Sequence, residues 1–182
     1  MEQEQYNEFS QLQEAVTAKL RSSTYRTDHV IRRQIQILVL PSFDDPYVWE
    51  VFQKGRRNDI NYELVHVCWR RDFDRVAFES PVNRLKYPHA FKPTIETRIA
   101  MIASETIINF LHHFRQIAVP LAVPDAPAGL DGTSYELAVG TFWCSARIRW
   151  WVRLPSQWAQ LQSPLDSLLM HFKQLLPETP QS

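Results

Sequence analysis

The sequence predicts an α+β fold: a mainly antiparallel sheet of about five strands with helices packed on one face. Apolar residues recur at helical spacing near both ends of the chain, in residues 3–21 and 163–176. Between them lie short runs that are alternating or fully apolar, which is typical of strands. These runs come in adjacent pairs instead of alternating singly with helices, which favours antiparallel pairing.

The composition is that of a folded domain. The chain has 182 residues, a length typical of one domain, so we expect residues 1–182 to form a single α+β unit. Six Trp and ten Phe in a chain that is 45% hydrophobic favour a packed core. We expect an N-terminal helix within residues 1–22 and a disordered tail at 177–182.

The first third of the chain predicts a strand between two helices. Residues 3–21 form an amphipathic helix with apolar positions three or four apart. Gln34 to Leu40 reads as a strand whose apolar end indicates a central place in the sheet. Asp44-Asp45-Pro46 resembles a helix start and predicts a short helix that ends near Gly55.

The middle of the chain predicts a hairpin and then the longest helix. Residues 63–69 and 74–79 read as two strands, with Leu64, His66 and Cys68 on one face of the first. Residues 94–117 have apolar side chains along one side and predict a helix central to the core. The proline-rich segments 80–93 and 118–130 predict connections.

The last third predicts a hairpin followed by a helix. Asp131-Gly132 is a turn signal, and two runs of period-2 alternation lie between it and residue 153. Ser163 and Pro164 then predict the start of a final amphipathic helix that Pro177 ends.

Arginine and tryptophan gather on one face of this last hairpin. Alternation places four residues on that face: Arg147, Arg149, Trp151 and Arg153. Glu136 falls on the same face if the apolar faces coincide, and it can then pair with Arg147 or Arg149. Two interpretations stay open. The face is either a solvated one with cross-strand ion pairs, or a recognition surface in which Arg grips carboxylate or phosphate and Trp provides a stacking plane.

The same hairpin carries a resemblance. Residues 130–137 read LDGTSYEL, and residues 146–151 read ARIRWW, with Pro155 and Trp158 after them. This pattern resembles a segment in uncharacterised bacterial proteins, some of them immunity-type or defence-associated. The resemblance covers about 30 residues. It implies a defence-related role and assigns no catalytic residue.

The charge balance does not indicate a dedicated nucleic-acid-binding protein. Lys and Arg number 20, as do Asp and Glu, so the formal net charge is zero. Two basic segments, 19–33 and 54–71, nevertheless form a patch if they converge in space. The residues that would then contact phosphates are Arg26, Arg32, Arg33, Arg56 and Arg57.

The sequence favours no catalytic, metal or cofactor site. Cys68 and Cys144 lack the spacing of metal ligands and are expected to be free thiols in a cytoplasmic protein. Glu105, Asn109 and His112 form a stripe that reads as the solvent edge of a helix. We therefore expect a non-enzymatic intracellular module that binds an unidentified protein partner and no membrane. Nucleic-acid binding is the alternative, and the oligomeric state stays open.

Overall fold

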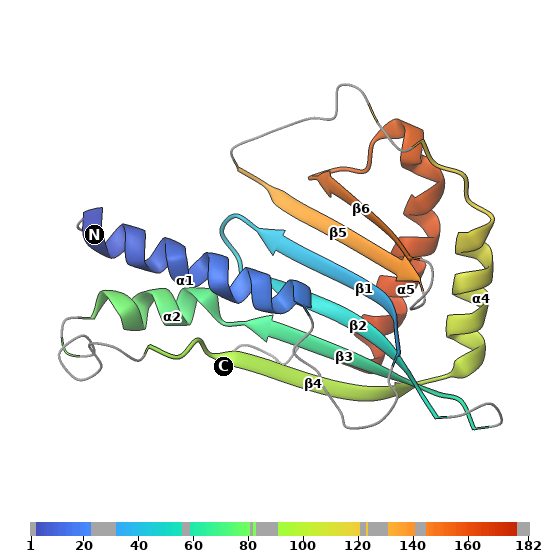
Figure 1. Cartoon of the computed structure of the whole chain (residues 1–182), viewed down its shortest axis with the longest axis horizontal. Coiled ribbons are helices and arrows are strands. Elements are labelled where there is room, and N and C mark those ends of the chain that lie inside the picture. The colour runs from blue at the N-terminus through green and yellow to red at the C-terminus, as the bar shows by residue number, and fades with distance from the viewer. Residues whose placement is uncertain are drawn as a thin grey trace.

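Six antiparallel strands form one continuous sheet (Figure 1). The computed structural model describes residues 3–22, 32–55, 59–80, 82, 91–120, 123, 131–140 and 145–177. Its elements, in chain order, are α1 (Gln3–Ser22), β1 (Arg32–Pro41), β2 (Tyr47–Lys54), β3 (Asn61–Trp69), α2 (Arg71–Glu79), β4 (Ile95–Ile102), α4 (Ser104–Arg115), β5 (Thr133–Gly140), β6 (Ser145–Trp151), η1 (Ser156–Leu161) and α5 (Gln162–Leu175). The α+β class and the antiparallel sheet are thus confirmed, with six strands in place of about five.

Strand β1 lies inside the sheet, as its apolar end predicted. The strand order is β4-β3-β2-β1-β5-β6, so β1 pairs with β2 on one side and β5 on the other. The hairpin β5–β6 therefore extends the sheet beyond β1, and β6 is an edge strand among the described residues. This topology places the last hairpin beside β1, the strand that follows α1 in the chain.

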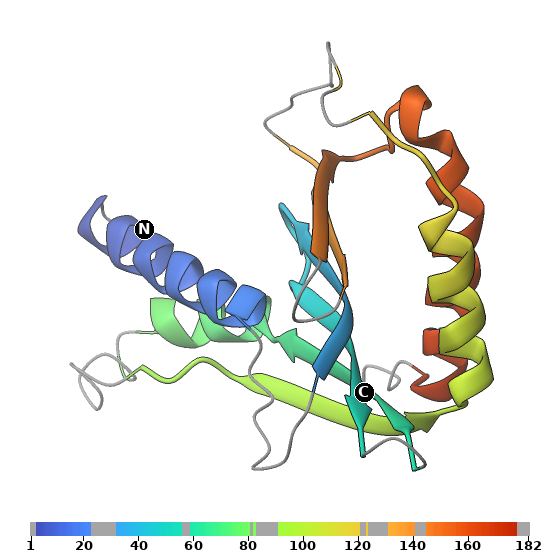
Figure 2. The same ribbon diagram turned by 45° about the vertical axis from the view of Figure 1, so that its right-hand side comes forward.

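Helices cover both faces of the sheet, whereas the sequence predicted one face (Figure 2). Helices α1 and α2 lie on one side, where Leu20 packs with Leu38 and Val65. Helices α4 and α5 lie on the other, where Phe172 packs in the cluster that contains Ile37. The prediction was wrong because the central strands are apolar on both sides, and each apolar face needs its own cover.

Residues 47–54 form strand β2 and not the predicted short helix. The run alternates, with Val48 and Phe52 facing α1 and Trp49 and Val51 packing in the opposite core. Both faces are buried because β2 lies between β1 and β3. β-Branched and aromatic side chains suit such a two-sided position, and tertiary pairing overrides the helix-start signal at Asp44 to Pro46.

Two other predicted elements are also wrong. Residues 74–79, expected as a strand, belong to helix α2, in which Val76 is exposed and Phe78 packs against the core. Residues 94–117, expected as one helix, form strand β4 and then helix α4. Ile95 and Ile99 lie four residues apart, a spacing that fits one face of a helix and one face of a strand equally well.

Helix α1, strand β3 and both strands of the last hairpin are confirmed. Helix α5 is also confirmed with Leu165, Leu168 and Phe172 buried, although η1 leads into it and Ser163 provides no cap. The predicted tail lies largely outside the described residues, as does much of both proline-rich connections. Among the described residues, none of the helices is long and apolar enough to span a bilayer.

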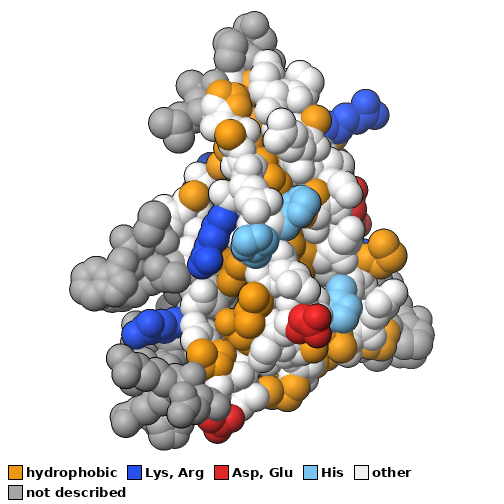
Figure 3. All heavy atoms as spheres, turned by 90° about the vertical axis from the view of Figure 1, so that its right-hand side faces the viewer, with side chains coloured by type: hydrophobic (Ala, Val, Ile, Leu, Met, Phe, Trp, Pro, Cys, Tyr) orange, Lys and Arg blue, Asp and Glu red, His pale blue; other side chains and the backbone are white. Residues whose placement is uncertain are grey.

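Helices α4 and α5 form the outer surface on their side of the sheet (Figure 3). Glu105, Asn109 and His112 are all exposed on α4, which confirms that this stripe is the solvent edge of the helix. Histidine and apolar side chains are scattered over the visible surface and do not gather at one hollow.

Candidate partner-binding surface

The last hairpin presents the two faces that its alternation predicted. Glu136 on β5 lies opposite Arg149 on β6, and Leu137 lies opposite Ile148. Tyr135 stacks on Trp150, with ring centroids 5.3 Å apart and an interplanar angle of 9°. That pair lies with the α4–α5 core, so the arginines occupy the α1 side. We call this arginine-rich face, together with the turn after β6, the hairpin surface: Glu136, Arg147, Arg149, Trp151 and Arg153.

Glu136 is buried beneath this surface and is surrounded by arginines. Its Oε1 lies 2.6 Å from Nη2 of Arg21 on α1 and 2.5 Å from Nη2 of Arg149. Arg147 Nη1 lies 3.9 Å from the other carboxylate oxygen, Oε2. The predicted cross-strand pairing is therefore confirmed, and a third arginine from a distant helix joins it. One carboxylate thus faces three positive charges.

The arginines keep Glu136 ionised. Burial alone would raise the pKa of this carboxyl, because a buried charge loses its hydration. Hydrogen bonds and positive charge from Arg21 and Arg149 outweigh burial and hold the pKa below its usual range. The carboxylate consequently remains a fixed negative charge that orients the guanidinium groups around it.

Buried polar side chains fix the C-terminal end of α1 over the sheet. Gln36 Nε2 donates to the carbonyl oxygens of Leu20 and Arg21 at 3.3 Å and 3.0 Å. It also donates to Glu50 Oε1, which lies 2.9 Å from Nη1 of Arg33. These contacts satisfy carbonyl groups that the last helical turn leaves unpaired. They place Arg21 next to Glu136.

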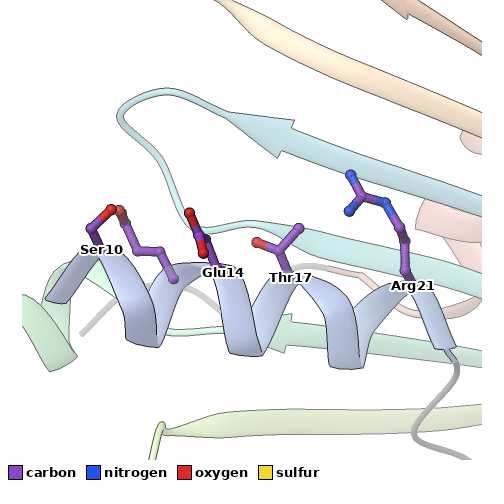
Figure 4. Close-up of a pocket in the computed structure, with 5 residues that line it drawn as sticks. Ser10, Glu14, Thr17 and Arg21 are labelled. Atoms are coloured by element: carbon purple, nitrogen blue, oxygen red, sulfur yellow. The ribbon is translucent and has the colours of Figure 1, made fainter. Parts of the chain in front are cut away.

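An open hollow of about 250 Å³ runs along the side of α1 next to these contacts. Five residues line it: Ser10, Gln13, Glu14, Thr17 and Arg21. In Figure 4 the labelled side chains rise from one side of α1 toward the strands. Because Arg21 also binds Glu136, the hollow and the hairpin surface adjoin at this residue.

The turn after β6 contains an uncommon backbone conformation. Val152 has a φ of +56°, a left-handed conformation that is strained for a β-branched residue. Its amide N donates to the carbonyl of Thr133 at 2.8 Å. A Cβ added at Gly132 would lie 2.5 Å from Val152 Cγ2 and 3.0 Å from Trp151 Nε1, so only glycine fits here. Strain of this kind is found most often at functional surfaces.

Of the five residues predicted for nucleic-acid binding, Arg32 and Arg33 are the two within the described residues, so the predicted patch stays a prediction. Arg33 is paired with buried Glu50, and Lys54 with Glu63. Lys54 pairs with Asn61 at the start of β3, and Arg70 follows the last residue of β3, so these two basic residues lie at opposite ends of that strand. Arg32 is exposed at the start of β1. Arg26, Arg56 and Arg57 lie outside the described residues.

The buried histidine and the half-buried thiol on β3 are held neutral by their surroundings. The His66 ring packs against Trp49 at a centroid distance of 4.1 Å and an interplanar angle of 40°, and its Nδ1 lies 3.0 Å from Arg98 Nη2. Burial and the charges of Arg98 and Lys173 lower the pKa of His66 to about 4. Burial and neighbouring acids raise the pKa of Cys68 to about 12, so it is not an activated nucleophile. Cys144 lies outside the described residues.

The sequence did not indicate that α1 contributes to this surface. Arg21 lies in the last turn of a regular amphipathic helix, and its partner lies 115 residues further along the chain. Only the topology, which places β5 beside β1, brings them together. No protein-family model, curated protein or solved structure matches this chain.

Proposed function

We propose that the protein is a non-enzymatic interaction module that binds an acidic segment of a protein partner through the hairpin surface. The observation that carries this proposal is the excess of arginine around one buried carboxylate. Glu136 is only 4% exposed, whereas the side chains of Arg147 and Arg149 are 49% and 59% exposed. About half of each arginine side chain is therefore open to solvent and to a second carboxylate.

The arrangement favours binding because it is already ordered. A free arginine loses side-chain entropy when it binds, and a guanidinium already held by Glu136 loses less. Arg can form two parallel hydrogen bonds with a carboxylate, which gives the contact direction as well as strength. Trp151 is half-buried beside the arginines, and Trp and Arg are the residues most often found at interface anchors.

The adjoining hollow gives this partner segment a place to lie. Ser10, Gln13 and Thr17 offer hydroxyl and amide groups that can hydrogen-bond an extended backbone. Arg21 at its inner end adds positive charge next to Glu136. We therefore envisage an acidic segment that runs along α1 and ends on Arg147 and Arg149.

The resemblance of the hairpin to segments of defence-associated bacterial proteins supports a role of the immunity type. In such a role the bound partner would be a protein whose activity is blocked by the complex. Nucleic-acid binding has less support, because Arg33, Lys54 and Arg70 are each paired with acidic side chains. Phosphate contacts would compete with those ion pairs.

Affinity capture from the native cells, followed by quantitative mass spectrometry, tests the proposal. Arg147→Glu reverses the charge of an exposed side chain whose ion pair with Glu136 is a long contact of 3.9 Å. Arg115→Glu, on exposed α4, makes the same charge change on the opposite side of the sheet and is the matched control. We expect one partner to be lost from the Arg147→Glu capture and kept in the control. Equal capture by both variants would exclude the hairpin surface, and capture of nucleic acid alone would favour the alternative.

A further inference from the structure

Helix α2 buries two charged side chains and exposes two apolar ones, although its Phe78 packs against Phe9 in the core. Arg71 and Asp74 are buried, whereas Phe73 and Val76 are 65% and 66% exposed. At these four positions the pattern is the opposite of a usual surface helix, which buries its apolar stripe. Such a reversal is stabilised only where the inward charges are satisfied.

Specific hydrogen bonds fix α2 in this orientation. Asp74 Oδ2 accepts from Trp69 Nε1 at 2.6 Å and from the Thr94 amide at 2.7 Å. Its Oδ1 accepts from Thr94 Oγ1 at 2.6 Å, and Arg71 Nη1 donates to the Pro41 carbonyl at 3.0 Å. A rotation of α2 that buried Phe73 and Val76 would leave these groups unpaired, which is strongly unfavourable for a buried carboxylate.

A third exposed apolar residue lies on the adjacent loop. Phe43, between β1 and β2, is 70% exposed. Its loop is held against the first turn of α2, because the Asp72 amide donates to Asp45 Oδ1 at 3.2 Å and Arg70 pairs with Asp45 at 3.1 Å. We call Phe43, Phe73 and Val76 the α2 patch. Grouped exposed apolar residues of this kind mark interaction sites.

The charges beside the patch are self-complementary. Asp72 and Arg75 are both about half exposed, and they lie 3.9 Å apart one helical turn from each other. We propose that the occupant of the α2 patch is a second copy of this chain, whose α2 packs antiparallel across a twofold axis. This dimer surface is separate from the hairpin surface, so the two proposals stand or fall independently.

Antiparallel packing aligns both the apolar and the charged residues. A twofold axis midway between Phe73 and Val76 sets Phe73 of each copy opposite Val76 of the other. At a rise of about 1.5 Å per residue, Asp72 of one copy then lies about 3 Å along the axis from Arg75 of the other. The twofold rotation places the charged sides of the two α2 helices on the same side of the contact. Each Asp72 therefore lies next to Arg75 of the other copy. An isologous contact needs this kind of self-complementarity.

Sedimentation velocity over a wide concentration range tests the proposal. We expect the wild type to form a weak dimer, because the patch is small. Val76→Glu places a charge at the centre of the contact and should raise the dimer dissociation constant by roughly tenfold or more. Met170→Glu, at a residue that is 58% exposed on α5, adds the same charge elsewhere and should leave the constant unchanged.

Charge reversal distinguishes the proposed geometry from a nonspecific apolar contact. Asp72→Arg alone should weaken the dimer about as much as Val76→Glu, and Asp72→Arg with Arg75→Asp should restore it. Circular dichroism confirms that each variant is folded. A wild type that stays monomeric, or a Val76→Glu variant that still dimerises, overturns the proposal. Binding of the wild type to phosphatidylcholine vesicles without self-association also overturns it and assigns the patch to a membrane surface.

Discussion

Arg21 and Glu136 are 115 residues apart in the chain, yet Nη2 of Arg21 lies 2.6 Å from Oε1 of Glu136. The contact joins the C-terminal end of α1 to the hairpin β5–β6. Arg149 binds the same carboxylate oxygen of Glu136. The geometry of the hairpin surface therefore depends on a helix from the other end of the sequence.

Replacing Glu136 with Gln should lower the free energy of unfolding by about 1–3 kcal/mol. The amide is similar in size but cannot balance the charges of Arg21 and Arg149, which would remain close together. Glu14→Gln, at an exposed position beside the hollow, should change stability by less than about 0.5 kcal/mol. Urea denaturation of both variants measures the difference, and equal values would show that the buried carboxylate is not what joins α1 to the hairpin.

His66 should make stability depend on pH in the mildly acidic range. Its pKa is lowered from 6.5 to about 4 in the folded protein, so the unfolded chain binds more protons between these values. The free energy of unfolding should therefore decrease as pH falls from about 6.5 to about 4, by at most about 3 kcal/mol. His66→Gln, which keeps an acceptor for Arg98, should flatten the profile in this window. His113→Gln, at an exposed residue on α4, should leave its slope unchanged.

Cys68 should react slowly with thiol reagents. Its pKa of about 12 leaves almost no thiolate at neutral pH, and the thiolate is the reactive form. In a Cys144→Ser background, the reaction with a chromogenic disulfide should be far slower for the native protein than for the protein in denaturant. A native rate close to the denatured one would mean that the thiol is accessible and ionised.

The strained turn after β6 should tolerate a residue that favours left-handed backbone. Val152→Asn should increase the free energy of unfolding by about 0.5–1 kcal/mol, because asparagine adopts positive φ more easily than valine. Val152→Ile keeps the β-branch and is the matched control, with no gain expected. A loss of stability in the Asn variant would contradict this. It would mean that packing of the half-exposed Val152 side chain stabilises the protein by more than the backbone strain destabilises it.

The hairpin could be predicted from sequence because its signals are local. Asp131-Gly132 marks the turn, and the strict alternation around Arg147 and Arg149 fixes which side chains share a face. Strand β4 could not be distinguished from a helix, since Ile95 and Ile99 satisfy both periods. Pairing with β3 is what makes this segment a strand, and the four-residue spacing alone does not reveal that pairing.

Helix α2 and the contribution of α1 were missed for different physical reasons. In α2 the apolar residues Phe73 and Val76 face outward, so a rule that buries apolar residues gives the wrong periodicity. The ion pair between Arg21 and Glu136 depends on long-range strand order, which no local pattern encodes. The inward hydrogen bonds of Asp74 likewise come from Trp69 and Thr94 on separate segments.

The most direct test of the central claim is photo-crosslinking in the native cells from position 147 on the hairpin surface. A photoreactive residue there should crosslink to one protein, and the crosslinked peptide should be rich in Asp and Glu because it faces Arg149 and Arg21. The same residue at position 115, on α4, should not crosslink to that protein. Crosslinks from both positions to the same peptide, or from position 147 to nucleic acid, would contradict the account.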